Sequence, residues 1–528
     1  MASILHSMGN ASDETVDAWD ELAQLDALMT RLSIKRSDLK RKINQFQSLI
    51  IRQLPPDVTS TIFEFCLPDF EDFQLARSPQ DLSVPLSLGA VCTYWREIAW
   101  STHTLWSSLV VHVIPSKRDW QTTIVQEWLA RSGQLPLSIR ILGFPRTAKA
   151  CEPAVAALAE SLNQYSTRWS HFDLSIPRSL YRYFHATYAP ILKYIRFYPR
   201  EDQYNPSTDF HINCPRLQRV WLSQCSPNTI NIQWDNITHL YLDAMRLSNC
   251  FLILRKTLPR LVFLSFSSFG GTELAEEPVV TSLRSLRVDM IDDSETILLD
   301  TLLCPHMEEL SLGPLCKSDF DFAPLKPIIS LIERSSCSLQ IFTVDITVDI
   351  FETDFERAMD ESLMSLLQLT PSLTKLSIIT SNHYAHTRSR QWNISELVVK
   401  VLSSQKAICQ ERFLPKLEIL EYTGELWHHL PRRNLPFLPS PTDDALQGSL
   451  RLIKLDISRA SHVPVDTVPF FMSLIKQGIT VNICSQSRDI LQASIDYHWS
   501  KERRFRQDWV DDLDLSLMQD HFFCVASP

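Results

Sequence analysis

Glycine is scarce in this chain. Ten glycines stand in 528 residues, well below the share of about 7% that is usual in proteins. Neither a GxGxxG string nor a GxxxxGK[ST] string occurs. Glycine-rich loops of these two kinds let backbone N–H groups approach nucleotide phosphates. The sequence therefore disfavours folds that bind dinucleotides or nucleoside triphosphates in this way, and we expect no cofactor.

Cysteine pairs and long apolar runs are also missing. The 12 cysteines are spread from Cys66 to Cys524 without a CxxC pair, which is typical of reduced, buried thiols in an intracellular protein. No stretch approaches the 18 apolar residues of a membrane span. Residues 1–10 lack the pattern of a secretory signal. We expect a cytoplasmic or nuclear protein with no membrane partner.

The chain has no excess of positive charge and no recognisable catalytic pattern. Its formal net charge is -10, so no nucleic-acid partner is expected. His383 and His386 stand three residues apart, but no glutamate lies between them as it does in zinc proteases. His428 and His429 are adjacent, and neighbouring residues on a helix do not face one site. We expect no metal site, no catalytic residues and no enzyme activity.

A repeated apolar string dominates the chain from about residue 165. It consists of an apolar residue, two mostly polar ones, an apolar residue, a variable one and another apolar residue. The first seven copies begin 20 to 25 residues apart and the later ones 32 to 44 apart, which fits leucine-rich repeats with insertions in the later copies. The copies are Trp169-Phe172-Leu174, Leu192-Ile195-Phe197, Leu217-Val220-Leu222, Ile237-Leu240-Leu242, Leu261-Leu264-Phe266, Leu283-Leu286-Val288, Met307-Leu310-Leu312, Leu339-Phe342-Val344, Leu373-Leu376-Ile378, Leu417-Leu420-Tyr422 and Leu452-Leu455-Ile457.

A proline precedes several of these copies, for example Pro215, Pro259 and Pro305. Each proline would end a preceding helix just before a strand begins. The predicted unit is therefore a strand followed by a helix, stacked so that each strand pairs in parallel with the next. The sequence resembles irregular leucine-rich repeats, and it lacks their asparagine ladder. The equivalent positions hold Cys225, Met245, Phe269, Ile291 and Leu315.

Residues 51–112 carry a second set of motifs. They are Leu54-Pro55-Pro56-Asp57, Ile62-Phe63, Val91-Cys92 followed by Trp95-Arg96, and Leu105-Trp106. Four elements in this order resemble the F-box, a short helical module that joins a substrate receptor to a cullin-RING ubiquitin ligase. Irregular leucine-rich repeats accompany the F-box in many receptors, including a large fungal set. The resemblance implies that a Skp-family adaptor, and through it a cullin, binds at Leu54, Pro55, Pro56, Ile62 and Phe63.

Helical spacing supports a small helix pair in this region. One predicted stripe holds Val58, Ile62, Phe65 and Cys66, and a second holds Leu88, Val91, Cys92, Trp95, Ile98 and Ala99. Two such stripes can share a core, with Trp95 as a structural residue. Pro55, Pro56 and Phe63 need not all fit inside that core, which leaves room for an apolar contact surface. An ordinary buried helical hairpin is the alternative.

A heptad series precedes the module. Apolar residues alternate at steps of three and four, and only Arg36 in the seam is polar. The helix over residues 18–50 could pack on the module or the next domain, or form a short homodimeric coiled coil; both remain open. The seam is Leu22, Leu25, Met29, Leu32, Arg36, Leu39, Ile43, Phe46 and Ile50.

The predicted fold class is α/β, with an N-terminal helix and a small helical F-box module followed by an irregular leucine-rich-repeat solenoid with parallel strands on one face. We expect a disordered segment over 1–17, a linker and the start of the array over 113–164, and the array itself over 165–485. Residues 486–528 are expected to form a helical cap, which a repeat array needs at its end; a separate partner-binding helix is the alternative.

Two insertions in the array, residues 380–394 and 424–441, combine aromatic and basic side chains. Tyr, Trp and Arg supply most of the binding energy of protein interfaces, and loops on a rigid scaffold commonly carry binding. The predicted function is the substrate-recognition subunit of an SCF-type ubiquitin ligase, which also binds a protein substrate. The alternative is an interaction scaffold that does not support ubiquitination. Candidate substrate-binding residues are Arg388, Arg390, Trp392, Trp427, Arg432 and Arg433.

Overall fold

The computed structural model describes most of the chain. The chain forms two compact units, Met1–Leu192 and Lys193–Pro528. The described residues are 21–40, 42–43, 54–67, 84–143, 148–185, 188–199, 210–256, 258–272, 277–289, 291, 293–314, 325–346, 353–380, 413–424, 449–457, 463, 468–476, 478–485 and 488–501.

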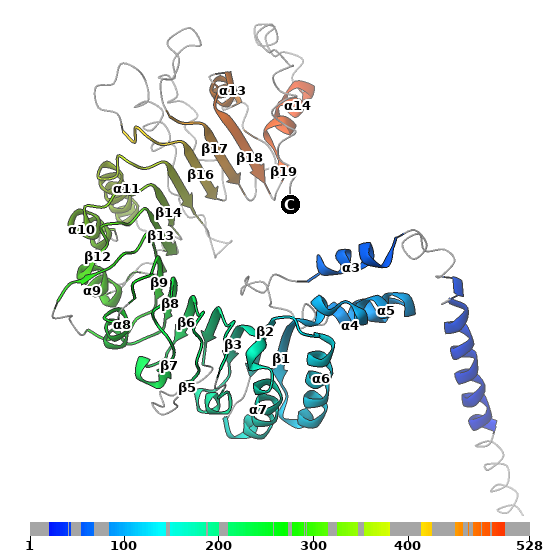
Figure 1. The fold of residues 1–528 in the computed structure, drawn as a ribbon. Helices are drawn as coiled ribbons and strands as arrows, with labels where there is room; N and C mark the ends of the chain where they lie inside the picture. The colour runs from blue at the N-terminus through cyan, green and yellow to red at the C-terminus, as the bar shows by residue number, and fades with distance from the viewer. Residues whose placement is uncertain are drawn as a thin grey trace, which may run out of the picture. The chain divides into compact units, whose positions relative to one another are not determined.

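The first unit begins with helices (Figure 1). A helix over residues 21–40 is followed by α3 (Pro56–Glu64), α4 (Val84–Val91) and α5 (Thr93–Ser101). Pro56 stands at the start of α3, where its missing N–H costs nothing. The Cys92 thiol caps α5 by accepting a hydrogen bond from the Trp95 N–H. The short 3₁₀ helix η2 (His103–Trp106) then leads into the first strand.

Three parallel strands complete the first unit. β1 (Ser108–Val113) pairs with β2 (Leu137–Gly143), and β2 pairs with β3 (Trp169–Ser175). The helices α6 (Arg118–Arg131) and α7 (Ala148–Asn163) connect them, as parallel pairing requires. The sequence pattern predicted β3, but β1 and β2 begin the series of parallel strands well before residue 165. Buried Leu109 and Val111 on β1, and Ile139 and Ile141 on β2, supply their core.

The second unit is built on one long sheet. Its strands run β4-β6-β8-β9-β11-β13-β14-β15-β16-β17-β18-β19 in space. The neighbouring strands from β4 to β18 pair in parallel, whereas the short β19 is antiparallel to β18. The strands are β4 (Tyr194–Phe197), β6 (Arg219–Ser223), β8 (His239–Asp243), β9 (Phe263–Ser267), β11 (Ser285–Asp289), β13 (Glu309–Pro314), β14 (Ile341–Asp345), β15 (Lys375–Ile379), β16 (Ile419–Gly424), β17 (Leu452–Ile457), β18 (Thr480–Ser485) and β19 (Arg488–Asp489).

Helices lie on one face of this sheet and leave the other face to the strands (Figure 1). Two short parallel pairs, β5 (Phe210–His211) with β7 (Ile230–Asn231) and β10 (Val279–Val280) with β12 (Leu302–Leu303), accompany the main sheet. The helices of the unit are α8 (Leu247–Leu254), α9 (Asp293–Thr301), α10 (Lys326–Ser335), α11 (Thr353–Gln368), α13 (Val468–Lys476) and α14 (Leu491–Lys501).

The repeat prediction is confirmed at the level of strands, with one correction. The three apolar residues of each of the first ten copies are buried, and every copy contributes a strand to the parallel series. The last copy was placed two residues too late. Ile453 and Leu455 pair with Leu420 and Tyr422, so the equivalent triple is Leu450-Ile453-Leu455. Ile457 also fits the apolar pattern because it is buried, at the end of a longer strand.

Buried side chains serve backbone N–H groups beside the strands. At one position where the asparagine ladder is missing, Glu295, fully buried in α9, accepts a hydrogen bond from the Phe269 N–H at 2.6 Å. Before two of the strands, Gln233 accepts from the Cys214 N–H at 2.6 Å, and Ser335 of α10 accepts from the Cys304 N–H at 3.0 Å. Buried backbone donors need such partners.

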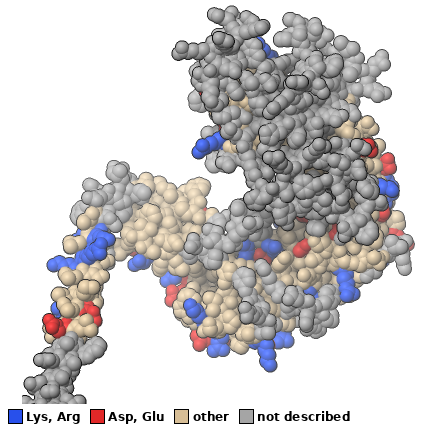
Figure 2. All heavy atoms as spheres, turned by 180° about the vertical axis from the view of Figure 1, so that it is seen from behind, with Lys and Arg blue, Asp and Glu red and all other residues tan. Residues whose placement is uncertain are grey.

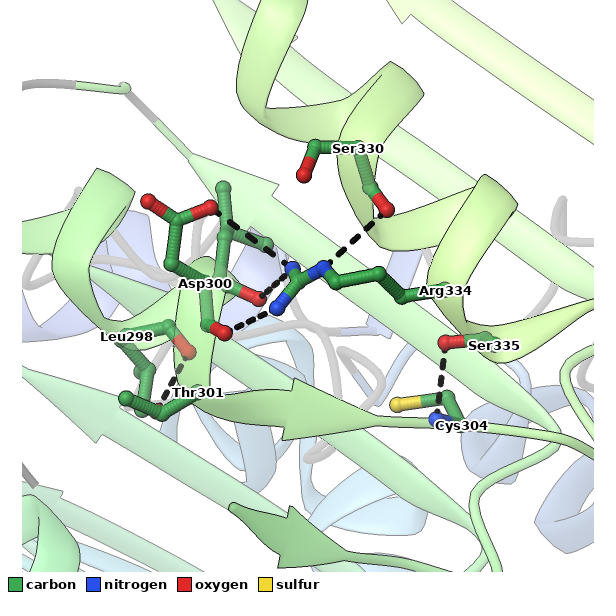
Figure 3. A network of polar contacts seen from close by, with 8 residues as sticks. Leu298, Asp300, Thr301, Cys304, Ser330, Arg334 and Ser335 are labelled. Atoms are coloured by element: carbon green, nitrogen blue, oxygen red, sulfur yellow. Dashed lines mark hydrogen bonds and ion pairs between the residues drawn. The ribbon is translucent and has the colours of Figure 1, made fainter. Parts of the chain in front are cut away.

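Arg334 ties neighbouring helices together (Figure 3). From α10 its guanidinium donates to the carbonyl of Leu299, at 2.9 Å, and to that of Asp300. The Asp300 carboxylate lies 3.6 Å from the same group. The last carbonyls of a helix have no partner within it, and a cation at that end complements the helix dipole. Arg334, which belongs to the next repeat, therefore caps the C-terminal end of α9.

Other expectations concern absences and the termini. No helix among the described residues is long and apolar enough to span a membrane. Within the same residues, no group of three or more His, Cys, Asp or Glu side chains could hold a metal ion. The predicted disordered segment 1–17 lies outside the described residues. Of the predicted cap, α14 follows the last strands, and residues 502–528 lie outside.

Candidate interaction surfaces

α3 buries a different face from the one its apolar stripe predicted. Thr59 and Phe63 are its buried residues, and the Phe63 ring meets Trp95 of α5 edge-on at 4.9 Å. Val58, Ile62 and Phe65 are 40, 45 and 86% exposed. The prediction that this stripe forms the shared core is therefore wrong. A single large ring, Phe63, anchors the helix, so the spacing rule pointed to the wrong side.

The predicted adaptor-binding residues divide accordingly. Pro55, Pro56 and Ile62 are exposed, and Leu54 is half-buried, with its carbonyl accepting a hydrogen bond from the Tyr94 hydroxyl at 3.4 Å. Phe63 is only 1% exposed. It therefore belongs to the core of the module, and its prediction as a contact residue is corrected.

α4 also displays exposed apolar side chains. Leu86 is 41% exposed and Val91 is 58% exposed, although Val91 was predicted to lie in the shared core. Trp95 is half-buried rather than fully buried as predicted. A folded protein has little reason to display several large apolar side chains on two short helices unless they bind something. We call Val58, Ile62 and Phe65, which share one side of α3, the apolar face of the module.

Leu105 and Trp106 lock the module onto the strands of the first unit. Both are fully buried, and the Trp106 indole donates to the Ala99 carbonyl at 2.7 Å. Its ring lies 4.7 Å from that of Trp128 on α6, and the Arg131 guanidinium lies 4.8 Å from it. The terminal Leu-Trp motif therefore serves packing, which leaves the apolar face free of a structural task.

A second surface lies on the strand face of the second unit. Side chains that alternate with the buried ones point to this face. Trp221 of β6 stacks on Tyr241 of β8 at 5.0 Å with ring planes 9° apart. Tyr241 in turn lies 5.1 Å from Phe263 of β9, and the Arg196 guanidinium of β4 lies 4.4 Å from Trp221. We call Arg196, Trp221, Tyr241 and Phe263 the aromatic row.

The aromatic row is half-buried along its whole length, and polar groups border it. Asp243, at the end of β8, accepts hydrogen bonds from Ser223 at 3.1 Å and from Ser267 at 2.8 Å. Farther along the sheet the same face turns ionic, with Arg287 paired to Asp289 and Lys375 paired to Glu421, each at 2.9 Å. The aromatic character is therefore concentrated on the first strands of the unit.

Sequence reasoning missed the aromatic row. It named only the buried members of each repeat, such as Val220 and Leu240. It did not use the variable position that directly follows each of these two residues. That position holds Trp221, Tyr241, Ser265 and Arg287 in successive copies. Its aromatic residues in two adjacent copies were the signal that could have found this surface, because equivalent positions of neighbouring strands lie side by side.

The predicted substrate-binding residues lie outside the described residues. This holds for Arg388, Arg390, Trp392, Trp427, Arg432 and Arg433 alike. The strands that carry the two insertions, β15 and β16, are neighbours that pair in parallel. The predicted role of these six residues in substrate binding therefore stays a prediction.

Cys214, Cys250 and Cys304 of the second unit are buried. Burial raises the pKa of the Cys214 thiol and that of the Cys304 thiol to about 11 each. For Cys250, burial raises the pKa further, and the nearby Glu295 carboxylate adds to the rise. A thiol with a raised pKa is a poor nucleophile at neutral pH. These three side chains pack the repeats and are poorly suited to chemistry.

Comparisons with known proteins add little to this geometry. No family model matches the chain, and no curated protein matches it. Among solved structures, the chain is similar to the crystal structure of a TLR13-ssRNA13 complex, with 12% identity over 67% of this chain and a TM-score of 0.20. It spans 59% of that chain's length. The resemblance is too weak to support any argument.

Proposed function

We propose that the protein is a non-catalytic substrate receptor, in which the α3–α5 module binds a Skp-family adaptor and the repeats bind a protein substrate. The observation that carries the proposal is the apolar face of the module. Phe63 and Trp106 already satisfy the packing of these helices, so the exposed Val58, Ile62 and Phe65 are available for a partner. The F-box-like motifs supply the identity of that partner.

In this function the chain contributes proximity and no chemistry of its own. The adaptor would connect the module to a cullin, and the repeats would hold the substrate near a ubiquitin-loaded enzyme. Holding two reactants together converts a bimolecular transfer into an effectively intramolecular one. The aromatic row is a suitable substrate surface, because half-buried rings with an arginine over them resemble the hot spots of interfaces. The insertions at 380–394 and 424–441 remain the other proposed surface.

Adaptor capture by purified proteins tests the proposal. Ile62→Asp combined with Phe65→Asp places charge on the apolar face and should abolish capture. Lys117→Asp combined with Arg118→Asp, on the exposed start of α6, introduces two similar changes elsewhere and should leave capture intact. Circular dichroism and thermal unfolding confirm that both variants fold. Undiminished capture by the Ile62/Phe65 variant would remove the main support for the receptor function.

The second candidate function is an interaction scaffold that does not support ubiquitination. It shares the exposed apolar face, so adaptor binding alone does not separate the two. Addition of a cullin-RING complex to the adaptor-bound protein does. Ubiquitin transfer to a protein that co-purifies with the chain supports the receptor, and stable assembly without any transfer supports the scaffold.

A further inference from the structure

The N-terminal helix displays an uncovered apolar seam. Every described residue over 21–40 and 42–43 is exposed, and the seam residues Leu25, Leu32 and Leu39 are 53, 56 and 52% exposed. They repeat every seven residues, and leucine at this heptad position favours two-stranded coiled coils. Helices in proteins gain most of their stability from packing an amphipathic face. A partner helix with a matching seam would cover these leucines.

The charged residues that flank the seam are separated by sign. The residues that flank the seam are Glu21 and Asp26 in the first half, and Lys35, Lys40 and Lys42 in the second half. Figure 2 shows basic side chains gathered toward one end of the helix and acidic ones toward the other. Residues flanking the seam choose the partner and its direction, so this separation is informative.

A parallel, in-register pair of identical helices would bring like charges together. Each flanking residue then meets the one five positions later in the other chain. Glu21 would meet Asp26, and Lys35 would meet Lys40. In addition, the two copies of Arg36 would face each other inside the seam. Like charges so placed destabilise a coiled coil, so the sequence opposes this arrangement.

An antiparallel pair removes these contacts between like charges. If Leu22 packs opposite Leu39 of the second copy, then Met29 packs opposite Leu32, and Arg36 packs opposite Leu25. Glu21 then flanks Lys42 of the second copy. Asp26, next to Leu25, comes beside Arg36 of the second copy. Each contact occurs twice because the pair is symmetric. Arg36 thereby lies at the same height in the coiled coil as the Asp26 carboxylate of the other copy.

We propose that residues 21–43 pair with the same segment of a second copy as an antiparallel coiled coil, so that two receptors are joined through their N-terminal helices. The apolar seam supplies the driving force, and the charge complementarity sets the direction. This inference goes beyond the proposed function and does not depend on adaptor binding. A dimer of this kind would carry two modules and two repeat arrays.

Sedimentation of the full-length protein tests the pairing. We expect a concentration-dependent dimer, and we expect Glu21→Lys combined with Asp26→Lys to raise the dimer dissociation constant at least tenfold. Adding Arg36→Glu and Lys42→Glu to this variant restores opposite charges at both contacts and should recover the dimer. Asp38→Lys is the matched control, because position 38 lies away from the seam. A wild-type protein that stays monomeric at about 100 μM overturns the proposal, whether the helix packs on its own chain or awaits another protein.

Disulfide formation tests the direction. One protein carries Leu22→Cys and a second, of different tag size, carries Leu39→Cys, both with Cys66→Ser to remove an exposed thiol. The antiparallel pair predicts that the mixture forms mainly the mixed disulfide on mild oxidation. If the main products are disulfides that join position 22 to position 22 and position 39 to position 39, the pair is parallel and the proposed arrangement is refuted. Adaptor capture by the charge-reversed monomer should equal that of the wild type, so failure here and failure of the proposed function remain distinguishable.

Discussion

Phe63 and Ile62 are neighbours in sequence with opposite roles. Phe63 is buried against Trp95, whereas Ile62 is 45% exposed. The motif Ile-Phe is the same string in either role, and helical spacing alone assigned Phe65 rather than Phe63 to the core. A side chain of 86% exposure has no reason to be aromatic for packing. At the scale of single residues, the structure decides which half of the motif is buried and which half is exposed.

The first prediction follows from this division. Phe63→Ala should lower the free energy of unfolding of the first unit by about 3–5 kcal/mol, as expected for a buried aromatic. Ile62→Ala should change it by less than about 0.5 kcal/mol, as expected for a surface substitution. Chemical denaturation of the full-length variants measures both. Equal effects would mean that the two residues share one environment, contrary to the structure.

Thiol reactivity provides a second prediction. Cys66 is exposed and Cys214 and Cys304 are buried, with their pKa values raised to about 11. At pH 8 an alkylating reagent should modify Cys66 within minutes and the other two only after unfolding, as peptide mass spectrometry can follow. The ordinary pKa of a cysteine thiol is 9.0. Because burial raises this pKa in the folded state, the free energy of unfolding falls as the pH rises from 9 through about 11. Rapid modification of Cys304 in the folded protein would contradict this.

At the scale of elements, the strands were predictable and the helix contacts were not. Ten of the predicted triples are buried in the expected register, because alternation along a strand is a local property. The contacts of Arg334 with Leu299 and Asp300 join residues more than 30 positions apart. No local pattern reports such a pair, just as none reported that Glu295 serves the Phe269 N–H.

Arg334 is the subject of the third prediction. Arg334→Ala removes the donors that close α9 and should lower the free energy of unfolding of the second unit by about 1–3 kcal/mol, because carbonyl acceptors lose a charged partner. Arg334→Lys keeps the charge but not the fork of donors, and should recover only part of the loss. Hydrogen exchange should speed up first at the end of α9. Unchanged exchange there would indicate that water replaces the guanidinium without cost.

At the scale of the whole molecule, the sequence predicted an array but not where its binding surface lies. The prediction favoured long insertions because they contain Arg, Trp and Tyr. The aromatic row uses arginine and aromatic residues too, one in each of the strands β4, β6, β8 and β9. Residues some 20 positions apart form one surface only when parallel strands align them. Composition within a window therefore cannot detect it.

The last prediction separates these two surfaces. Trp221→Ala combined with Tyr241→Ala should abolish capture of a co-purifying substrate if the aromatic row binds it, since each residue can carry more than 2 kcal/mol of binding energy. Replacing Arg388, Arg390, Arg432 and Arg433 by glutamate should abolish substrate capture only if the insertions bind the substrate. Both variants should capture the adaptor like the wild type, because the apolar face of the module is untouched. Quantitative mass spectrometry of tagged proteins measures both partners at once. Loss in the first variant alone assigns recognition to the strand face, loss in the second alone assigns it to the insertions, and full capture by both would exclude each surface as the main determinant.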